Sequence, residues 1–188
     1  MSADAHEAAR LSPGFPPPTT GSGPLAEPET PSFARLSPDQ RGALVAARDE
    51  LTRFVSEMRL LKDPYEIAQM RLAVEATGRG FDDIVAELPR IIDTPRGERA
   101  IEGVFHLRAR TDGNGEGYDT IAASGPHACY LHWTRNDGAV VPGDLVLIDA
   151  GVEVDSLYTA DITRTLPVSG TFSPVQRRIY ETVREAAD

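Results

Sequence analysis

The chain has 188 residues, enough for one ordinary domain with a buried core but too few for two large domains. Its 29 acidic and 19 basic side chains give a formal charge of -10, which disfavours binding to phosphate backbones or anionic lipid and favours cationic partners such as metal ions. The single cysteine, Cys129, excludes an internal disulfide framework and suits a reducing compartment.

Residues 1–36 differ in composition from the rest of the chain. They hold seven prolines with scattered Gly, Ser and Thr and few large apolar side chains, which favours a disordered tail over a polyproline II ligand because the proline spacing is irregular. The first 20 residues lack a secretory signal, and no apolar run approaches the length of a membrane span. We expect a disordered tail over 1–36, a folded domain over 37–188, and a cytoplasmic location without nucleic-acid or membrane binding.

Three helix starts share one pattern, in which a polar cap precedes proline at the first helical position and Glu or Gln at the third. The three stretches are Ser37-Pro38-Asp39-Gln40, Asp63-Pro64-Tyr65-Glu66 and Ser173-Pro174-Val175-Gln176. A fourth helix is predicted to begin at the cap Thr94 with Pro95 behind it. Gly78 and Gly80 leave open a break in the second helix.

Apolar residues recur along these helices at helical spacing, which predicts core-facing stripes. The predicted core positions are, in chain order, Leu44, Leu51, Phe54, Val55 and Met58; then Ile67, Met70, Val74, Phe81, Ile84, Val85 and Leu88; then Ile101, Val104 and Phe105. Val175, Ile179 and Val183 form a further stripe.

After residue 117 the pattern changes to short β-like runs, predicted at 118–123, 129–133, 145–154 and 158–167. Helices followed by strands, with little alternation, indicate an α+β fold in which helices pack on a mostly antiparallel sheet.

Two aspartates stand out within the last two predicted strands. If these strands form a hairpin centred on Asp155, then Asp149 and Asp161 lie directly opposite each other on one face, with Cβ atoms about 4.5–5.5 Å apart. Two partly desolvated carboxylates repel each other unless a cation lies between them, and divalent metal ions resolve that conflict. The alternative is that both aspartates satisfy turn amides, because the hairpin register is inferred.

Five segments together resemble the aminopeptidase P and prolidase group of pita-bread metallopeptidases, and aminopeptidase P most of all. In chain order they are 62–67 (KDPYEI), 117–125 (GYDTIAASG), 131–136 (LHWTRN), 143–151 (GDLVLIDAG) and 158–167 (YTADITRTLP). The resemblance covers residue 60 to the end and implies the first half of a pita-bread fold, with cleavage of the residue that precedes proline.

The resemblance also implies roles for individual residues. Asp149 and Asp161 match two metal ligands of a two-ion site, and the usual ions are manganese. His132 matches a histidine beside the metals that binds substrate or the charge developing at the scissile carbonyl. Tyr118 matches a tyrosine that supports a metal-bound carboxylate, although a core aromatic is the plain alternative. His106 and His127 match no ligand, while Asn136, Arg164, Cys129 and Trp133 indicate structure or packing.

The chain departs from the family pattern because the remaining histidine and two glutamate ligands belong to a later half of the domain. We therefore expect a C-terminally truncated catalytic domain that binds metal weakly and is inactive alone. Expected partners are peptides with proline at the second position, and either a second copy or a complementing C-terminal half. A non-catalytic peptide- or protein-binding module, a prolidase-type dipeptidase and a methionine aminopeptidase are the alternatives.

Overall fold

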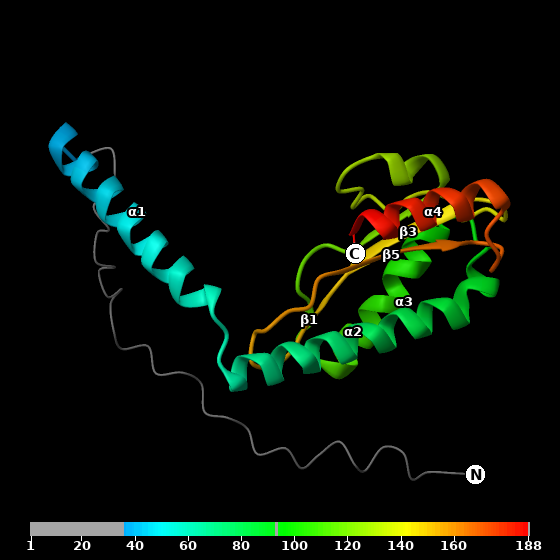
Figure 1. Ribbon diagram of the computed structural model, residues 1–188, viewed down its shortest axis with the longest axis horizontal. Coiled ribbons are helices and arrows are strands. Elements are labelled where there is room, and N and C mark those ends of the chain that lie inside the picture. Colours follow the sequence, from blue (N-terminus) through cyan, green and yellow to red (C-terminus); the bar gives the residue numbers. More distant parts are fainter. Residues whose placement is uncertain (1–35, 93, 188) are drawn as a thin grey trace, which may run out of the picture. The chain divides into compact units, whose positions relative to one another are not determined.

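The computed structural model describes residues 36–92 and 94–187. The predicted tail over 1–36 therefore lies, except for Leu36, outside the described residues. The chain divides into two units at residue 57, and the second unit, Met58–Asp188, contains every element after the first helix. Figure 1 follows the element order: α1 Pro38–Leu60, α2 Pro64–Ile91, α3 Gly97–Asp112, β1 Gly115–Glu116, β2 Ile121–Ser124, the 3-10 helix η2 Gly125–Cys129, β3 Leu145–Ala150, β4 Val152–Glu153, β5 Ile162–Pro167 and α4 Pro174–Ala187.

The three predicted capping sequences all begin helices, at Pro38, Pro64 and Pro174. In α2, Glu66 N donates to Asp63 Oδ1 at 2.8 Å while Asp63 N donates to Glu66 Oε2 at 2.7 Å. Ser and Gln make the same reciprocal pair of bonds at the start of α1 and of α4. Each pair satisfies two backbone groups that the helix leaves without a partner.

The apolar stripe predicted for the first helix is not core. Helix α1 has no buried residue, and Leu51 and Phe54 are 61% and 62% exposed. The helical period is present, so the local prediction of a helix is confirmed. Burial, however, needs a second surface, and the described part of this unit, residues 36–57, offers α1 none.

Helix α2 buries a different face from the one predicted over its first half. Ile67, Met70, Val74 and Val85 are exposed, whereas the buried face is made largely of small residues. The buried residues of α2 are Ala73, Ala76, Thr77, Gly80, Ile84, Leu88 and Ile91. A face of small residues lets α3 approach closely. The free energy gained from this close packing outweighs the gain from burying the larger apolar side chains on the other face.

Gly80 explains why α2 runs on without the break that its glycines left open. A Cβ at this position would lie 2.6 Å from Cε2 of Phe105, the fully buried aromatic of α3. Glycine is needed here for packing between two helices, so its low helix propensity does not mark a helix end. The core predictions for Ile101 and Phe105 are confirmed, and Val104 packs against the same core.

Helix α3 begins at Gly97, with Arg96 at the cap and no side-chain capping bond. The start predicted at Thr94 is wrong, because the Thr94 hydroxyl donates to Ile91 O at 2.7 Å and so closes the turn after α2.

The larger sheet has the order β2-β3-β5 and is antiparallel throughout. Alternate residues of β3 are buried, so one face of the sheet covers the core. That face presents Val146, Ile148 and Ala150 to α2 and α3, which lie side by side beneath it in Figure 1. The α+β fold predicted from the sequence is confirmed.

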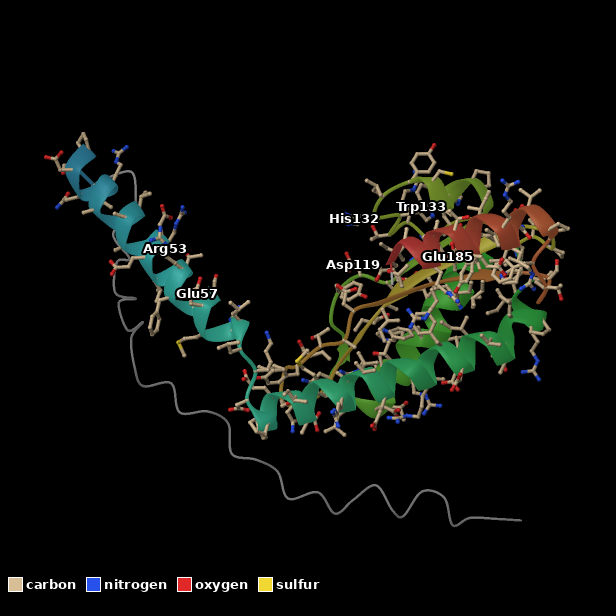
Figure 2. The ribbon with its side chains drawn as sticks, in the orientation of Figure 1. Arg53, Glu57, Asp119, His132, Trp133 and Glu185 are labelled. Carbon is tan, nitrogen blue, oxygen red and sulfur yellow. The ribbon has the colours of Figure 1, made fainter. Side chains whose placement is uncertain are left out.

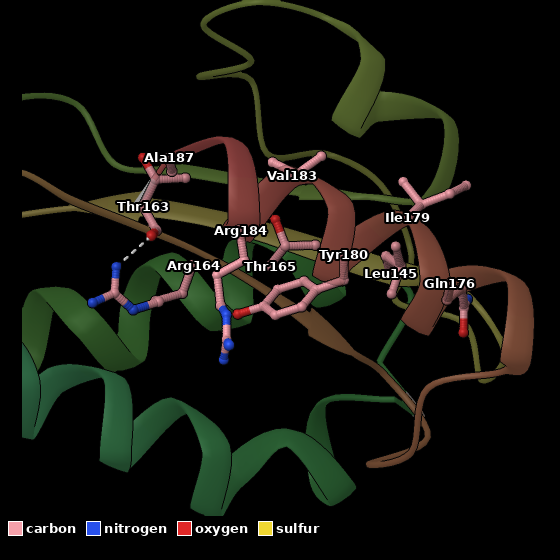
Figure 3. Close-up of a pocket in the computed structure, with 10 residues that line it drawn as sticks. All are labelled: Leu145, Thr163, Arg164, Thr165, Gln176, Ile179, Tyr180, Val183, Arg184 and Ala187. Atoms are coloured by element: carbon pink, nitrogen blue, oxygen red, sulfur yellow. Dashed lines mark hydrogen bonds between the residues drawn. The ribbon is translucent and has the colours of Figure 1, made fainter.

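The opposite face of the sheet lies beneath α4. Figure 3 shows a groove between them, to which β3 contributes Leu145, β5 contributes Thr163 and Thr165, and α4 contributes Ile179 and Val183. Helix α4 has no buried residue. Its predicted apolar stripe is present but stays exposed.

Three predicted strands have other limits, and one does not exist. Residues 118–120 precede β2, the 145–154 run divides into β3 and β4 at Gly151, and β5 begins at Ile162. The segment predicted as a strand over 129–133 is not one: Cys129 ends the 3-10 helix η2, which begins at Gly125 with a φ of 55°, and residues 130–133 form a loop. Among the described residues, no helix combines the length and apolarity needed to cross a bilayer.

Candidate metal centre

The hairpin that carries the two aspartates closes one residue later than predicted. Val154 N donates to Tyr158 O at 3.0 Å, and Leu157 N donates to Val154 O at 2.8 Å. Leu157 has a φ of 68°, which suits a three-residue loop that ends in the left-handed region. The turn is therefore centred on Ser156, and the centre predicted at Asp155 is wrong.

This turn sets the pairing of the two strands. Asp149 lies opposite Thr163, and Ala150 lies opposite Ile162. The predicted direct pairing of Asp149 with Asp161 is therefore wrong by two residues. A shift of two residues preserves the face, because side chains alternate with a period of two. Asp149 and Asp161 are diagonal neighbours on the same face, where Cβ atoms typically lie about 7–8 Å apart or slightly closer.

Tyr118 joins the two carboxylates. Its hydroxyl lies 2.6 Å from Asp149 Oδ1 and 3.0 Å from Asp161 Oδ1, so both carboxylates converge on one phenol oxygen. Burial, followed by the hydrogen bonds and the charges of the two aspartates, raises the pKa of Tyr118 above its ordinary value. The hydroxyl therefore remains a donor at neutral pH.

The backbone around Tyr118 approaches the hairpin closely. Gly117 N donates to Gly151 O at 2.9 Å. A Cβ at Gly151 would collide with Ala160 O and would also lie 3.1 Å from the Tyr118 ring. The glycine that follows Asp149 and Ala150 is therefore required by close contact between the two strands and the segment before β2.

A cleft brings together all four residues that the sequence singled out. Its lining consists of Tyr118, Asp119, Ile121, His132, Thr134, Asp149 and Asp161. His132 comes from the loop over residues 125–138, called the His132 loop below. In Figure 2, His132 and Asp119 lie near each other at one end of the sheet. Asp119, Ile121 and Thr134 also line the cleft; the sequence did not single them out, although all three lie within the matching segments 117–125 and 131–136.

The two carboxylates suit a divalent cation. Asp149 and Asp161 use only Oδ1 with Tyr118, and within residues 36–92 and 94–187 their Oδ2 atoms have no hydrogen-bond partner and no Lys, Arg or His forms an ion pair with them. Hard oxygen donors with unused lone pairs fit a hard divalent cation. The same residues contain no group of three or more His, Cys, Asp or Glu placed to hold a metal.

The remaining residues of interest have structural contacts. His127 Nδ1 lies 2.8 Å from Glu98 Oε1, and its ring stacks on Trp133 at 4.0 Å. Asn136 is fully buried and accepts a hydrogen bond from Ala122 N. Cys129 is exposed, so the packing role predicted for it is wrong.

With the geometry in place, comparison with known proteins identifies the family. The model of metallopeptidase family M24 matches residues 68–188. The chain belongs to family M24.

Curated relatives of this M24 chain are Xaa-Pro aminopeptidases. Xaa-Pro aminopeptidase 1 of Streptomyces coelicolor is 56% identical over 146 residues, which make up 77% of this chain and 29% of the relative. The Haemophilus influenzae Xaa-Pro aminopeptidase is 44% identical over 133 residues, which make up 70% of this chain and 30% of the relative. The M24 chain is thus a homologue that spans less than a third of the length of these relatives.

Solved structures support the fold of this M24 chain. A variant of Escherichia coli aminopeptidase P in complex with substrate matches with a TM-score of 0.59 at 41% identity, covering 68% of this chain and 28% of that one. Proline aminopeptidase P II from Yersinia pestis matches with a TM-score of 0.60 at 36% identity, covering 72% and 30%. The resemblance to part of a pita-bread catalytic domain is confirmed. A metal site is implied by the family and by a zinc-substituted form of the Escherichia coli enzyme among the matching structures.

Proposed function

We propose that this chain supplies part of the two-metal site of an Xaa-Pro aminopeptidase, in which Asp149 and Asp161 bind Mn²⁺. The proposed reaction is hydrolysis of the bond that joins an N-terminal residue to proline, and the proposed substrates are peptides with proline at the second position. Two homologues, at 56% and 44% identity, are Xaa-Pro aminopeptidases, and they support this proposal.

The observation that carries the proposal is the convergence of two carboxylates on one phenol. Like charges on neighbouring strands repel, and one shared hydroxyl offsets that repulsion only in part. A divalent ion at the unused carboxylate oxygens would offset it fully. When bound, such ions act as Lewis acids on the scissile carbonyl.

The protein's own residues have separate tasks in this proposal. Tyr118 orients both carboxylates, as hydrogen-bonded neighbours of metal ligands do in other enzymes. His132, which lines the same cleft, donates a hydrogen bond to the oxygen on which negative charge develops. Thr134 lines the same cleft and offers a hydroxyl to the substrate backbone.

The remaining ligands are proposed to come from a complementing C-terminal half, since the chain spans only 29% and 30% of the length of the two relatives. Two carboxylates alone bind a divalent ion weakly, because most of its coordination sites stay hydrated. We therefore propose that the 188-residue chain alone binds Mn²⁺ with low affinity and does not turn over peptide.

Calorimetric titration with Mn²⁺ tests the ligand assignment. The wild-type chain should bind, while Asp161→Ala and the isosteric Asp161→Asn should lose binding. Asp155→Asn is the matched control, since this exposed aspartate sits at the tip of the same hairpin. Equal binding by Asp161→Asn and the wild type would remove the basis of the assignment.

A peptide assay on the same samples separates the proposal from its alternatives. Addition of a C-terminal half from a homologous enzyme should produce cleavage before proline, and that cleavage should be lost in Asp161→Asn. Binding of the peptide without metal would support a non-catalytic binding module. Cleavage restricted to dipeptides would support a prolidase-type enzyme.

A further inference from the structure

A buried glutamate ties the His132 loop to α3. Glu98 lies in the first turn of α3 and is fully buried. Its Oε1 accepts from Ser124 N at 2.8 Å and lies 2.8 Å from His127 Nδ1. Its Oε2 accepts from Gly138 N at 2.7 Å and from Trp133 Nε1 at 3.0 Å.

These four contacts use all of the acceptor capacity of one carboxylate. An ionised carboxylate offers about four lone-pair sites, and four donors occupy them here. Glu98 contacts the residue before the His132 loop, the last residue of the loop, and two residues within it. A single side chain therefore sets the position of both ends and of the middle.

The contact nearest to His132 along the chain is that of Trp133, which directly follows it. The Trp133 indole N–H donates to Glu98, its ring stacks on the His127 ring at 4.0 Å between centroids, and the Arg135 guanidinium carbon lies 5.5 Å from its centroid. With Trp133 held by three contacts, the backbone of its neighbour has little freedom.

His132 itself has a backbone conformation that needs such support. Its φ is 54°, in the left-handed region that side chains other than glycine rarely adopt. Thr134 N donates to His132 O at 2.9 Å. Residues held in this region persist when the surrounding structure determines them, and they concentrate at functional sites.

Glu102, one turn further along α3, reinforces the same attachment. Its Oε2 accepts from Asn136 Nδ2 at 3.1 Å, and Asn136 also donates to Thr120 O at 2.9 Å. Gly138 is required for the approach of the loop, because a Cβ there would lie 2.8 Å from Glu98 Oε2.

We propose that Glu98 is a positioning residue that, through Trp133, holds the His132 imidazole over the cleft that contains Asp149 and Asp161. This inference rests on the proposed function for the role of His132. It extends that function to a residue of the core that touches neither metal nor substrate.

The test compares the full wild-type chain with Glu98→Gln. The amide keeps the shape of the side chain but replaces one acceptor oxygen with an NH₂ group, which faces two donors. Thr77→Val is the matched control, because Thr77 is also fully buried and joins α2 to Val152 N at 2.9 Å without contact to the loop. Both variants are expected to lose stability.

Two readouts by nuclear magnetic resonance separate positioning from stability. Without metal, the His132 amide should be as ordered as the amides of β3 in the wild type and in Thr77→Val, and clearly less ordered in Glu98→Gln. With Mn²⁺ added, paramagnetic broadening should reach both Ala150 and His132 in the wild type. In Glu98→Gln, broadening of His132 should fall several-fold while that of Ala150 persists.

The outcomes are distinguishable. Broadening of His132 that is unchanged in Glu98→Gln would overturn the positioning role and leave the metal site standing. Absence of broadening at both residues in the wild type would instead overturn the proposed function, and the order of the His132 amide would then decide the inference alone. Fluorescence of Trp133, the single tryptophan of the chain, should shift to longer wavelength in Glu98→Gln and stay unchanged in Thr77→Val.

If Glu98→Gln does not fold, Trp133→Phe takes its place. This variant removes the indole donor to Glu98 and keeps an aromatic ring. Order and paramagnetic broadening at His132 should therefore fall as in Glu98→Gln, but by a smaller amount. If the order of the His132 amide and its broadening by Mn²⁺ are unchanged in Trp133→Phe, the inference is overturned.

Discussion

Asp149 and Asp161 lie on one face of the sheet without facing each other, because Asp149 pairs with Thr163. The hydroxyl of Tyr118 bridges the offset, at 2.6 Å and 3.0 Å from the two Oδ1 atoms. A diagonal pair leaves more room between the carboxylates than a direct pair does. The arrangement therefore suits ions placed between the two side chains better than a proton shared by them.

Tyr118→Phe tests the bridge. Loss of the shared donor frees both carboxylates to rotate, so Mn²⁺ affinity should fall about tenfold, at the lower end of the range for residues that orient metal ligands. Calorimetric titration measures the change, with Tyr130→Phe as the control because that ring is exposed. Tighter binding by Tyr118→Phe would mean that the phenol competes with the metal for the same oxygens.

Gly80 and Gly78 form a matched pair for the contact between α2 and α3. Gly80→Ala places a Cβ 2.6 Å from the Phe105 ring, so it should lower the free energy of unfolding by about 1–3 kcal/mol through overpacking. Gly78→Ala meets nothing within 4 Å and should raise it by up to about 1 kcal/mol through helix propensity. Urea denaturation of both variants measures the difference, and equal effects would contradict the packing role of Gly80.

Asp112 should make stability depend on pH. Its carboxylate lies 2.7 Å from Arg79 Nε and 3.4 Å from Arg108 Nη1, and the hydrogen bond from Arg79 is the main cause that lowers the pKa of Asp112. A depressed folded-state pKa stabilises the protein above the unfolded value of about 3.9, and this stabilisation is lost as pH falls through the folded value.

The size of that contribution is about 1 kcal/mol or less, because Arg79 is about half exposed and water screens the pair. Urea denaturation of the wild type and Asp112→Asn between about pH 7 and pH 2 measures it. The two free energies of unfolding should differ at neutral pH and converge in acid. Asp49→Asn, which changes an exposed aspartate, is the control, and parallel curves for Asp112→Asn and the wild type would refute the assignment.

The apolar groove between α4 and β5 should make the isolated chain self-associate. Ile179 and Val183 line this groove, and both are more than half exposed. Exposed apolar surface of this kind favours association. Sedimentation of the wild type should show oligomers at high concentration, and the oligomeric fraction should be smaller for Ile179→Asp. Leu131→Asp should match the wild type, since Leu131 is exposed on the His132 loop outside the groove. A compact monomer at every concentration would contradict this expectation.

The sequence alone determined the features that depend on neighbours along the chain. Capping residues next to proline placed three helix starts correctly, and the β-like run predicted over 145–154 contains β3 and β4. The shared face of Asp149 and Asp161 also followed from period, because an error of two residues in register leaves the face unchanged. The motifs also indicated the family, and they singled out Tyr118, His132 and both aspartates, which the fold brings to one cleft.

Tertiary structure decided everything that depends on contacts between distant segments. The hairpin register came from the left-handed conformation of Leu157, and the buried face of α2 includes Gly80, which packs against Phe105 of α3. The attachment of the His132 loop depends on Glu98, which precedes Trp133 by 35 residues. A lone glutamate on a helix carries no local signal of burial, because its four donors come together only when the chain folds.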